Sequence, residues 1–262
     1  MSSRDLSVKI EVVQTRLGIN VRNYMITTLN LKNRSKIITQ LHKKKAIRVK
    51  TKTGLILEIN KYTLVPHPNT YRLIEIAAQL ISTDMKIKSI VDPGTGSGII
   101  AISLAKLFPK HSIFASDVSR ATLQTAKRNA TLNNINSIKF YENRLGTDVW
   151  LKEFNHFPID LIVANPPFIG IDEYTSPKFL KLWPEAVYEP LYAILAPDPE
   201  GISPFVKIFE SAFIHKTRYI VFECNSLNIS KLKRKFTPRS EYIKVYKDVE
   251  ENKRFMQIKL KR

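Results

Sequence analysis

The strongest constraint on the fold is a regular alternation of strand-like and helix-like runs from residue 88 onward. Short β-branched runs bounded by turns predict strands, and longer runs with helical spacing predict helices. The predicted strands cover 88–92, 112–117, 137–142, 159–164 and 218–224. The predicted helices cover 98–108, 119–134 and 203–213. This order predicts an α/β fold with a doubly wound, mostly parallel sheet, followed by an antiparallel pair at 241–248 and 253–260.

The chain before this unit has a different pattern. Residues 3–45 carry apolar residues at mixed helical spacing, which predicts short helices. Residues 46–59 alternate on both sides of a Thr-Gly pair, which predicts a β-hairpin. A further helix is predicted to begin near Asn69, with Asn69 or Thr70 as its cap.

These patterns divide the chain into three parts. We expect a small basic helical domain for substrate recognition at 1–45, a hairpin and linker at 46–68, and the main α/β domain at 69–262. The net charge of +19 lies at the ends, because residues 1–60 carry thirteen Lys and Arg against three Asp and Glu, and residues 231–262 carry twelve against four. These ends either contact RNA or a ribonucleoprotein, or are simply well solvated.

Composition excludes several classes of protein. The single cysteine, Cys224, excludes an intramolecular disulfide, and the five scattered histidines give no metal-ligand spacing. No apolar run reaches the roughly 18 residues of a membrane helix. The charged N-terminal residues do not resemble a secretory signal. We therefore expect a cytoplasmic protein without a metal.

A glycine-rich loop follows the first predicted strand of the sheet. Three of the eight glycines lie within five residues, in a loop that opens a helix and brings backbone N–H groups to a ligand. The spacing G-x-G-x-G differs from the dinucleotide pattern G-x-G-x-x-G and is typical of S-adenosylmethionine loops. The predicted loop contacts are Asp92, Gly94, Thr95, Gly96, Ser97 and Gly98. Asp117 ends the next strand, where it either accepts hydrogen bonds from ribose hydroxyls or caps the following helix.

The fourth predicted strand of the alternating unit ends in Asn165-Pro166-Pro167-Phe168. Prolines donate no backbone hydrogen bond, so the strand stops at the sheet edge where ligands bind. The Asn165 side-chain oxygen and the Pro166 carbonyl can hold the two hydrogens of a planar amino group, so that its lone pair faces an electrophile. Phe168 can stack on a flat acceptor. We predict that these four residues are catalytic and that Asn165 also contacts the cofactor.

Together, the glycine loop, Asp117 and the N-P-P-F motif resemble the S-adenosylmethionine-dependent N-methyltransferases. Residues 62–77, 188–212 and 245–260 are similar to segments of the release factor glutamine methyltransferases, the PrmC/HemK type. That resemblance covers roughly 55–260 and implies a seven-stranded sheet behind a small helical domain. It implies methylation of a glutamine side-chain amide in a peptide chain release factor, with Asn143 and Leu145 beside the adenine.

The sequence departs from the family pattern at several positions. His67 and Asn69 replace Arg and Glu, Arg144 replaces an acid, and Phe168 replaces the commoner Tyr. Two alternatives therefore stay open: methylation of an exocyclic amine of adenine or guanine in RNA, and a non-catalytic subunit with a methyltransferase fold. The intact N-P-P-F motif argues against the second alternative, because a binding subunit does not need it.

Overall fold

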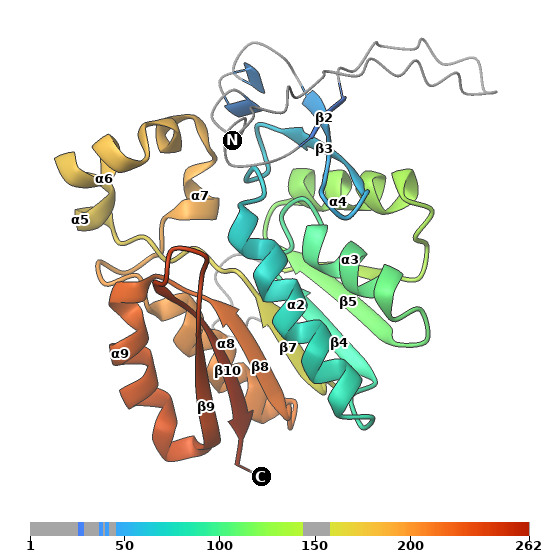
Figure 1. The fold of residues 1–262 in the computed structure, drawn as a ribbon, viewed down its shortest axis with the longest axis vertical. Coiled ribbons are helices and arrows are strands. Elements are labelled where there is room, and N and C mark those ends of the chain that lie inside the picture. Colours follow the sequence, from blue (N-terminus) through green and yellow to red (C-terminus); the bar gives the residue numbers. More distant parts are fainter. Residues whose placement is uncertain (1–25, 29–36, 39, 42–45, 144–157, 262) are drawn as a thin grey trace, which may run out of the picture.

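The computed structural model describes residues 26–28, 37, 38, 40, 41, 46–143 and 158–261, and it has an α/β architecture (Figure 1). Within this part of the chain, seven strands form one sheet in the order β6-β5-β4-β7-β8-β10-β9. Their bounds are β4 (Ser89–Pro93), β5 (Ser112–Asp117), β6 (Lys139–Glu142), β7 (Leu161–Ala164), β8 (Tyr219–Glu223), β9 (Ser240–Lys247) and β10 (Lys253–Leu260). Strands β6, β5, β4, β7 and β8 are parallel, whereas β10 pairs antiparallel with β8 and β9. The predicted doubly wound sheet and its antiparallel end are confirmed.

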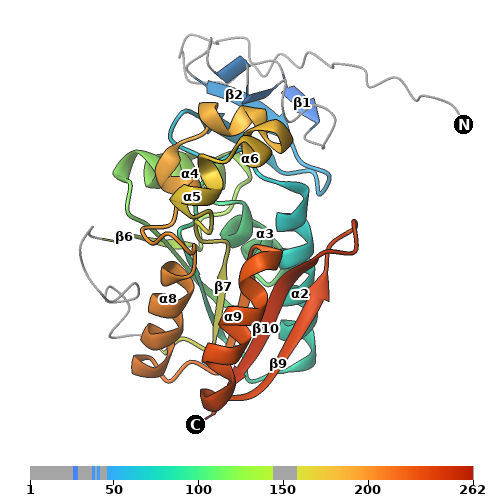
Figure 2. The ribbon, with the colours of Figure 1, turned by 90° about the vertical axis from the view of Figure 1, so that its left-hand side faces the viewer.

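Helices cover both faces of this sheet, as Figures 1 and 2 show. The helices of one face are α2 (Pro68–Thr83), α3 (Ile99–Leu107) and α4 (Arg120–Leu132), and those of the other are α8 (Ser203–Ile214) and α9 (Ser226–Phe236). Successive strand residues alternate between the faces, so that Ile90 and Leu161 join the core under α2 and α3. Val91 and Ile162 join the core under α8 and α9. Burial on both faces explains why these strands are continuous apolar runs.

A small sheet in the order β1-β2-β3 precedes the main domain. Strands β2 (Ala46–Lys50) and β3 (Ile56–Asn60) form the predicted antiparallel hairpin, and Gly54 in its turn has a φ of +80°. Strand β1 (Ile26–Thr28) pairs parallel with β2, so the helical prediction for these residues is wrong. The edge of β2 supplies backbone hydrogen-bond partners for these residues, which the local spacing of apolar residues does not reveal. Ile37, Ile38, Gln40 and Leu41 are helical, while most of the predicted domain 1–45 lies outside the described residues.

Two asparagines, Asn129 on α4 and Asn133 at its C-cap, attach the hairpin to the main domain. Asn133 accepts a hydrogen bond from Ile56 N at 2.9 Å and donates to Ile56 O at 2.7 Å. Asn129 accepts from Glu58 N and donates to Glu58 O, and it also donates to Ser97 O at 2.8 Å. The two amides, one helical turn apart, therefore satisfy the free edge of β3. Through Ser97, Asn129 also connects the hairpin to the glycine loop.

The N-terminus of α2 differs from the prediction. The cap is His67, whose Nδ1 accepts a hydrogen bond from Asn69 N at 3.3 Å, and Pro68 occupies the first helical position. Proline is well suited to that position because its φ is already helical and its missing N–H would have no partner there. Asn69 and Thr70 lie inside the helix, so the prediction that one of them is the cap is wrong.

Short helices between β7 and α8 form a layer above the carboxyl ends of the strands (Figure 1). They are α5 (Ile171–Tyr174), α6 (Pro177–Leu182), the 3-10 turn η2 (Pro184–Tyr188) and α7 (Leu191–Ile194). Their own apolar core contains Phe179, Ala186 and Ile194, packed with Ile169. These short helices and α9 were not predicted from the sequence. For α9, a signal existed: an Asn225 cap and basic residues in the last turn.

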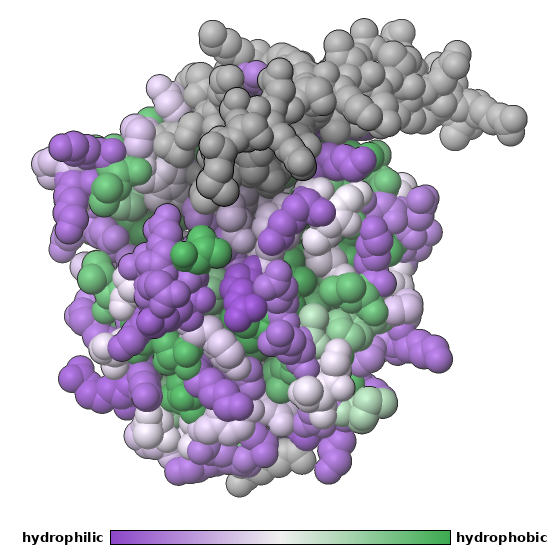
Figure 3. All heavy atoms as spheres, in the orientation of Figure 1, coloured by the Kyte–Doolittle hydropathy of each residue, from purple (hydrophilic) through white to green (hydrophobic). Residues whose placement is uncertain are grey.

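The surface mixes polar and apolar side chains. In Figure 3, polar residues are spread over this face between smaller apolar patches. Several large exposed apolar side chains belong to the layer of short helices, among them Leu182, Val187, Tyr188 and Leu191. Among the residues that the structure describes, no helix is long and apolar enough to span a membrane.

Candidate functional site

The glycine loop lies between β4 and α3, at the carboxyl edge of the sheet. Gly94, Gly96 and Gly98 have φ angles of +74°, +56° and +84°, which non-glycine residues rarely adopt. A Cβ on Gly94 or Gly96 would meet no atom within 4 Å, whereas one on Gly98 would lie 3.0 Å from Ile102 and 3.2 Å from Ala126. The first two glycines therefore keep the loop open to a ligand, and the third lets α3 and α4 pack closely.

Asp92, near the end of β4, stabilises the loop through hydrogen bonds from its buried side chain. Its Oδ2 accepts hydrogen bonds from Thr95 Oγ1 at 2.6 Å and Ala101 N at 3.2 Å. The side chain is only 1% exposed, and Oδ1 has no hydrogen-bond partner in the described part of the chain. Burial raises the pKa of Asp92 to about 7, although the two hydrogen bonds act in the opposite direction. Asp92 does not line the cavity beside the loop. We therefore infer that Asp92 stabilises the conformation of the loop and does not contact a ligand.

This raised pKa predicts a dependence of stability on pH. Between 3.8 and about 7 the folded protein keeps a proton on Asp92 that the unfolded chain releases. The contribution of Asp92 to stability is therefore complete below that range and is lost as the pH rises through about 7. We expect Asp92→Asn to reduce the difference in the free energy of unfolding between about pH 5 and pH 8, measured by urea titration. The exposed Asp172→Asn is the control, and an equal pH difference in the wild type and both variants would contradict the assignment.

Asp117 faces the glycine loop from the end of β5. Its Oδ2 accepts from Gly96 N and its Oδ1 from Ser119 N, both at 3.0 Å. The N-cap of α4 is Ser119, whose hydroxyl accepts from Thr122 N at 3.2 Å. Burial raises the pKa of Asp117, while hydrogen bonds from Ser119 and Gly96 lower it. A carboxylate with spare lone pairs is thus presented to the space beside the loop.

The space beside the loop is a cavity of about 270 Å³, here called the glycine-loop cavity. It brings together most of the predicted cofactor contacts: Gly94, Thr95, Gly96, Ser97, Asp117, Asn143 and Asn165. Asp92 and Gly98 lie behind its wall, and Leu145 and Arg144 lie outside the described residues.

Two tyrosines that the sequence did not predict, Tyr62 and Tyr192, also line the glycine-loop cavity. Tyr192 donates a hydrogen bond to Tyr62 O at 2.5 Å, and its hydroxyl lies 3.2 Å from Thr122 Oγ1. Burial raises the pKa of the Tyr192 phenol. These contacts join the layer of short helices to α4 and to the linker after β3. No spacing in the sequence could have indicated them, because the three segments meet only in the fold.

The N-P-P-F motif begins where β7 ends. Asn165 and Pro167 line the glycine-loop cavity and also a second cavity of about 390 Å³, here called the Phe168 cavity. The Asn165 side chain makes no hydrogen bond with the described part of the chain, so its amide is available to a ligand. The Phe168 carbonyl, in contrast, accepts a hydrogen bond from Asn228 Nδ2 at 3.4 Å. Asn165 therefore stands at the junction of the two cavities.

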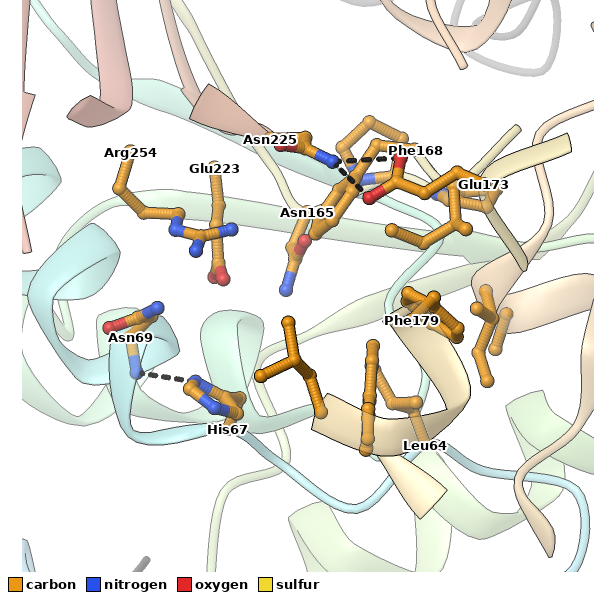
Figure 4. A pocket seen from close by; sticks show the side chains of 17 residues that line it. Leu64, His67, Asn69, Asn165, Phe168, Glu173, Phe179, Glu223, Asn225 and Arg254 are labelled. Carbon is orange, nitrogen blue, oxygen red and sulfur yellow. Dashed lines mark hydrogen bonds between the residues drawn. The ribbon is translucent and has the colours of Figure 1, made fainter. Parts of the chain in front are cut away.

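The Phe168 cavity has two different walls, which lie on either side of Asn165 in Figure 4. One wall is apolar and contains Leu64 and Phe179. The opposite wall is polar and contains His67, Asn69, Glu223 and Arg254, while Glu173, on the side of Phe179, and Asn225 complete the polar lining around Asn165. Three of the departures from the family pattern, His67, Asn69 and Phe168, thus lie in this cavity and not in the glycine-loop cavity. Within the described residues, no group of three His, Cys, Asp or Glu side chains could hold a metal ion.

Comparisons with known proteins agree with this geometry. Residues 63–179 match the family model described as methyltransferase small domain. A release factor glutamine methyltransferase of Flavobacterium psychrophilum is 38% identical over 61% of this chain and 53% of its own length. That of Lactococcus lactis is 36% identical over 62% of this chain and 55% of its own length. The chain therefore spans about half the length of the curated relatives it matches, and the resemblance seen in the sequence is confirmed over that part.

Solved structures confirm the fold. The hMettl16 catalytic domain, in complex with an RNA hairpin of the MAT2A 3′UTR, aligns with a TM-score of 0.62 at 17% identity, covering 87% of this chain and 80% of the other. The N-terminal domain of human METTL16 in complex with SAH aligns with a TM-score of 0.55 at 16% identity, covering 90% of this chain and all of the other. At such low identity the likeness concerns the fold alone.

Proposed function

We propose that the protein is an S-adenosylmethionine-dependent N-methyltransferase that acts on the side-chain amide of a glutamine in a peptide chain release factor. One observation carries the proposal: the Asn165 amide, which has no hydrogen-bond partner among the described residues, lies where the glycine-loop cavity meets the Phe168 cavity. A methyl donor in the first cavity and an amide in the second would meet at this side chain. The names of the relatives support the choice of a release factor glutamine as the acceptor.

The glycine-loop cavity fits S-adenosylmethionine. Open space at Gly94 and Gly96 allows a ligand to approach the backbone closely. The loop opens α3, whose N-terminus favours a carboxylate. Asp117 offers a carboxylate for ribose hydroxyls, and Asn143 lies beyond it, with its N–H donating to Asp117 O at 2.9 Å. When bound there, the cofactor supplies an electrophilic methyl group.

The protein contributes positioning at the acceptor nitrogen. An amide nitrogen is a poor nucleophile because its lone pair is delocalised into the carbonyl group. Asn165 and the carbonyl of Pro166 can accept the two amide hydrogens and fix the plane of the amide, so that the nitrogen lone pair points toward the glycine-loop cavity. Phe168 covers the flat face of the group. This arrangement needs no general base before methyl transfer.

Methylation of an RNA base is the alternative. Asn165 and the Pro166 carbonyl, here together called the amide clamp, could also hold the exocyclic amino group of a base. The basic residues of 1–60 and 231–262, including the exposed Lys233, Arg234 and Lys235 of α9, favour contact with RNA or the ribosome. The Phe168 cavity favours a peptide, because its lining has two carboxylates, Glu173 and Glu223, against one guanidinium, Arg254, and this balance disfavours a phosphate group. RNA contact through the basic ends, a substrate-recognition role for 1–45 and a cytoplasmic location remain predictions.

Transfer of a labelled methyl group tests the proposal. Purified protein and methyl-labelled S-adenosylmethionine are added to an extract of cells that lack the enzyme, and the product is digested with protease or with nuclease. We expect label that protease alone releases, in a band of release-factor size. Label that nuclease alone releases would show that the acceptor is RNA. Bound cofactor without any transfer would favour the non-catalytic subunit.

The cofactor assignment predicts that Asp117→Ala weakens binding of S-adenosylmethionine. The loss should be about 1.5–3 kcal/mol for each charged hydrogen bond removed, as measured by calorimetry. Ser119→Ala is the matched control, since it removes the cap of α4 without removing a carboxylate from the cavity. Equal affinity for S-adenosylmethionine in the wild type and Asp117→Ala would show that Asp117 does not bind the ribose.

A further inference from the structure

The polar wall of the Phe168 cavity brings together charged groups that methyl transfer itself does not use. Glu223 ends β8 and Arg254 lies near the start of β10, thirty-one residues later. They meet because β8 and β10 are antiparallel neighbours: Glu223 pairs with Phe255, and Cys224 N donates to Arg254 O at 2.9 Å. Figure 4 shows the Glu223 carboxylate and the Arg254 guanidinium next to each other, facing the same space as Asn69.

The turn between β9 and β10 holds Arg254 in this place. Arg254 Nε donates to Asp248 Oδ2 at 3.4 Å, and the Asp248 side chain is only 3% exposed. Asp248 Oδ1 accepts from Glu250 N and Asn252 N, both at 2.9 Å, so the turn itself fixes the carboxylate. The terminal amino groups of Arg254 make no hydrogen bond with the described part of the chain. They remain available to a molecule in the cavity.

The other polar groups in the lining of the cavity determine which kind of molecule could bind to Arg254. Asn225 is already engaged, since its Nδ2 donates to both carboxylate oxygens of Glu173 at 3.0 Å. Glu223 is 3% exposed, and one of its oxygens accepts a long bond of 3.4 Å from Thr70 Oγ1. The Arg254 guanidinium therefore offers donors on this wall, beside the Glu223 carboxylate, which is an acceptor group. Peptide C=O and N–H groups match this pair, whereas the carboxylate would repel a phosphate.

We propose that Arg254 and Glu223 form a subsite for the main chain of the polypeptide segment that carries the acceptor amide, with Asp248 positioning Arg254. The apolar wall with Leu64 and Phe179 then takes the methylene groups of the acceptor side chain. This inference rests on the proposed function and extends it from the amide to the peptide around it. It assigns specificity for a peptide to residues outside the N-P-P-F motif.

Steady-state kinetics with the purified release factor as the varied substrate test the subsite. We expect Arg254→Gln to raise KM for the release factor about tenfold while kcat changes less than about twofold, because the subsite binds the acceptor without touching the reacting atoms. Arg254→Lys should fall between the wild type and Arg254→Gln, since it keeps the charge but loses the planar fork. Asp248→Asn should raise KM in the same direction by loosening Arg254.

Arg239→Gln is the matched control. It removes an equal charge from the 3-10 turn η3 (Thr237–Arg239), where Arg239 pairs with the exposed Glu210. Its KM should stay at the wild-type value. Thermal melting of each variant separates loss of binding from loss of folding.

Each outcome of this experiment has a distinct meaning. An unchanged KM in a folded Arg254→Gln variant, with an active wild type, would overturn the subsite and leave the proposed function standing. A raised KM for an RNA acceptor, with none for the release factor, would overturn the assignment to a peptide. A wild type that methylates no release factor would overturn the proposed function, and the subsite with it.

Discussion

Replacing Asn165 by alanine should abolish most methyl transfer and leave cofactor binding nearly intact. Asn165 lines both cavities, and its side chain has no partner in the described part of the chain that its removal would disturb. The variant loses one of the two acceptors that orient the amide. Loss of one preorganised hydrogen-bonding group in an active site commonly costs about 10²–10³ in kcat. We therefore expect kcat to fall at least by that factor, while the Kd for S-adenosylmethionine changes by less than about threefold.

The control must separate lost chemistry from lost stability. Asn133→Ala removes the same side chain from the C-cap of α4, where it binds β3 and lines neither cavity. That variant should melt at a lower temperature and keep wild-type turnover below its melting point. If Asn165→Ala retained more than about a tenth of wild-type kcat, the amide clamp would not be the catalytic device.

The second large effect should come from Gly170→Ala. Gly170 has a φ of −72° and a ψ of 154°, which any residue adopts, so backbone strain is not the reason for glycine. A Cβ at this position would collide with the carbonyl group of Pro199. The segment cannot simply move away, because Ile169 N donates to Ile194 O at 3.1 Å and Ile169 O accepts from Ala196 N at 2.9 Å.

Relief of that collision must therefore displace the chain that carries Phe168. We expect a loss of about 1–3 kcal/mol in the free energy of unfolding, as for other overpacked sites. Turnover should fall about a hundredfold, because a displacement of about 1 Å at the site suffices for that loss. Urea titration and initial rates measure the two effects.

Gly54→Ala serves as the comparison, because its effect should come from backbone strain and not from a collision. Its φ of +80° makes alanine unfavourable, but no atom lies within 4 Å of the added Cβ. It should cost about 1 kcal/mol in stability without any change in turnover. If Gly170→Ala melted and turned over like the wild type, the packing of Gly170 against Pro199 would not position the catalytic motif.

The sequence predicted the sheet well because local and global signals agree there. Strand β5 lies at 112–117 as predicted, and β7 and β8 lie within their predicted ranges. Runs of β-branched residues between turns are compatible with few structures other than buried strands. The glycine loop and the N-P-P-F motif were equally predictable, because each occupies a short continuous segment at a strand end.

The layer of short helices was not predictable in the same way. Helices of four to six residues, such as α5 and α6, are too short to show a periodic apolar face. Their stability comes from contacts such as Phe179 with Trp183, whose ring centroids lie 5.6 Å apart. A local signal existed in Ser176-Pro177, which is a cap followed by proline at the first helical position.

The polar wall of the Phe168 cavity shows a further limit of sequence reasoning. Glu223 and Arg254 lie in segments that sequence alone cannot place next to each other. The insertion of β10 between β8 and β9 makes them neighbours. Likewise, Tyr192 meets Thr122 across seventy residues. Residues of these kinds determine which acceptor fits, so the sequence indicated the chemistry more firmly than the substrate.

The central claim is that the methyl group goes to an amide nitrogen, and the chemical form of the product tests it most directly. A cell extract labelled with the purified protein and methyl-labelled S-adenosylmethionine is hydrolysed in strong acid, and the volatile and non-volatile products are separated. A methylated glutamine amide yields glutamate and labelled methylamine, and this is the expected result. Label released as methanol by mild base would identify a carboxyl ester, and label retained in a purine base would identify RNA. Either result would contradict transfer of the methyl group to a glutamine amide nitrogen.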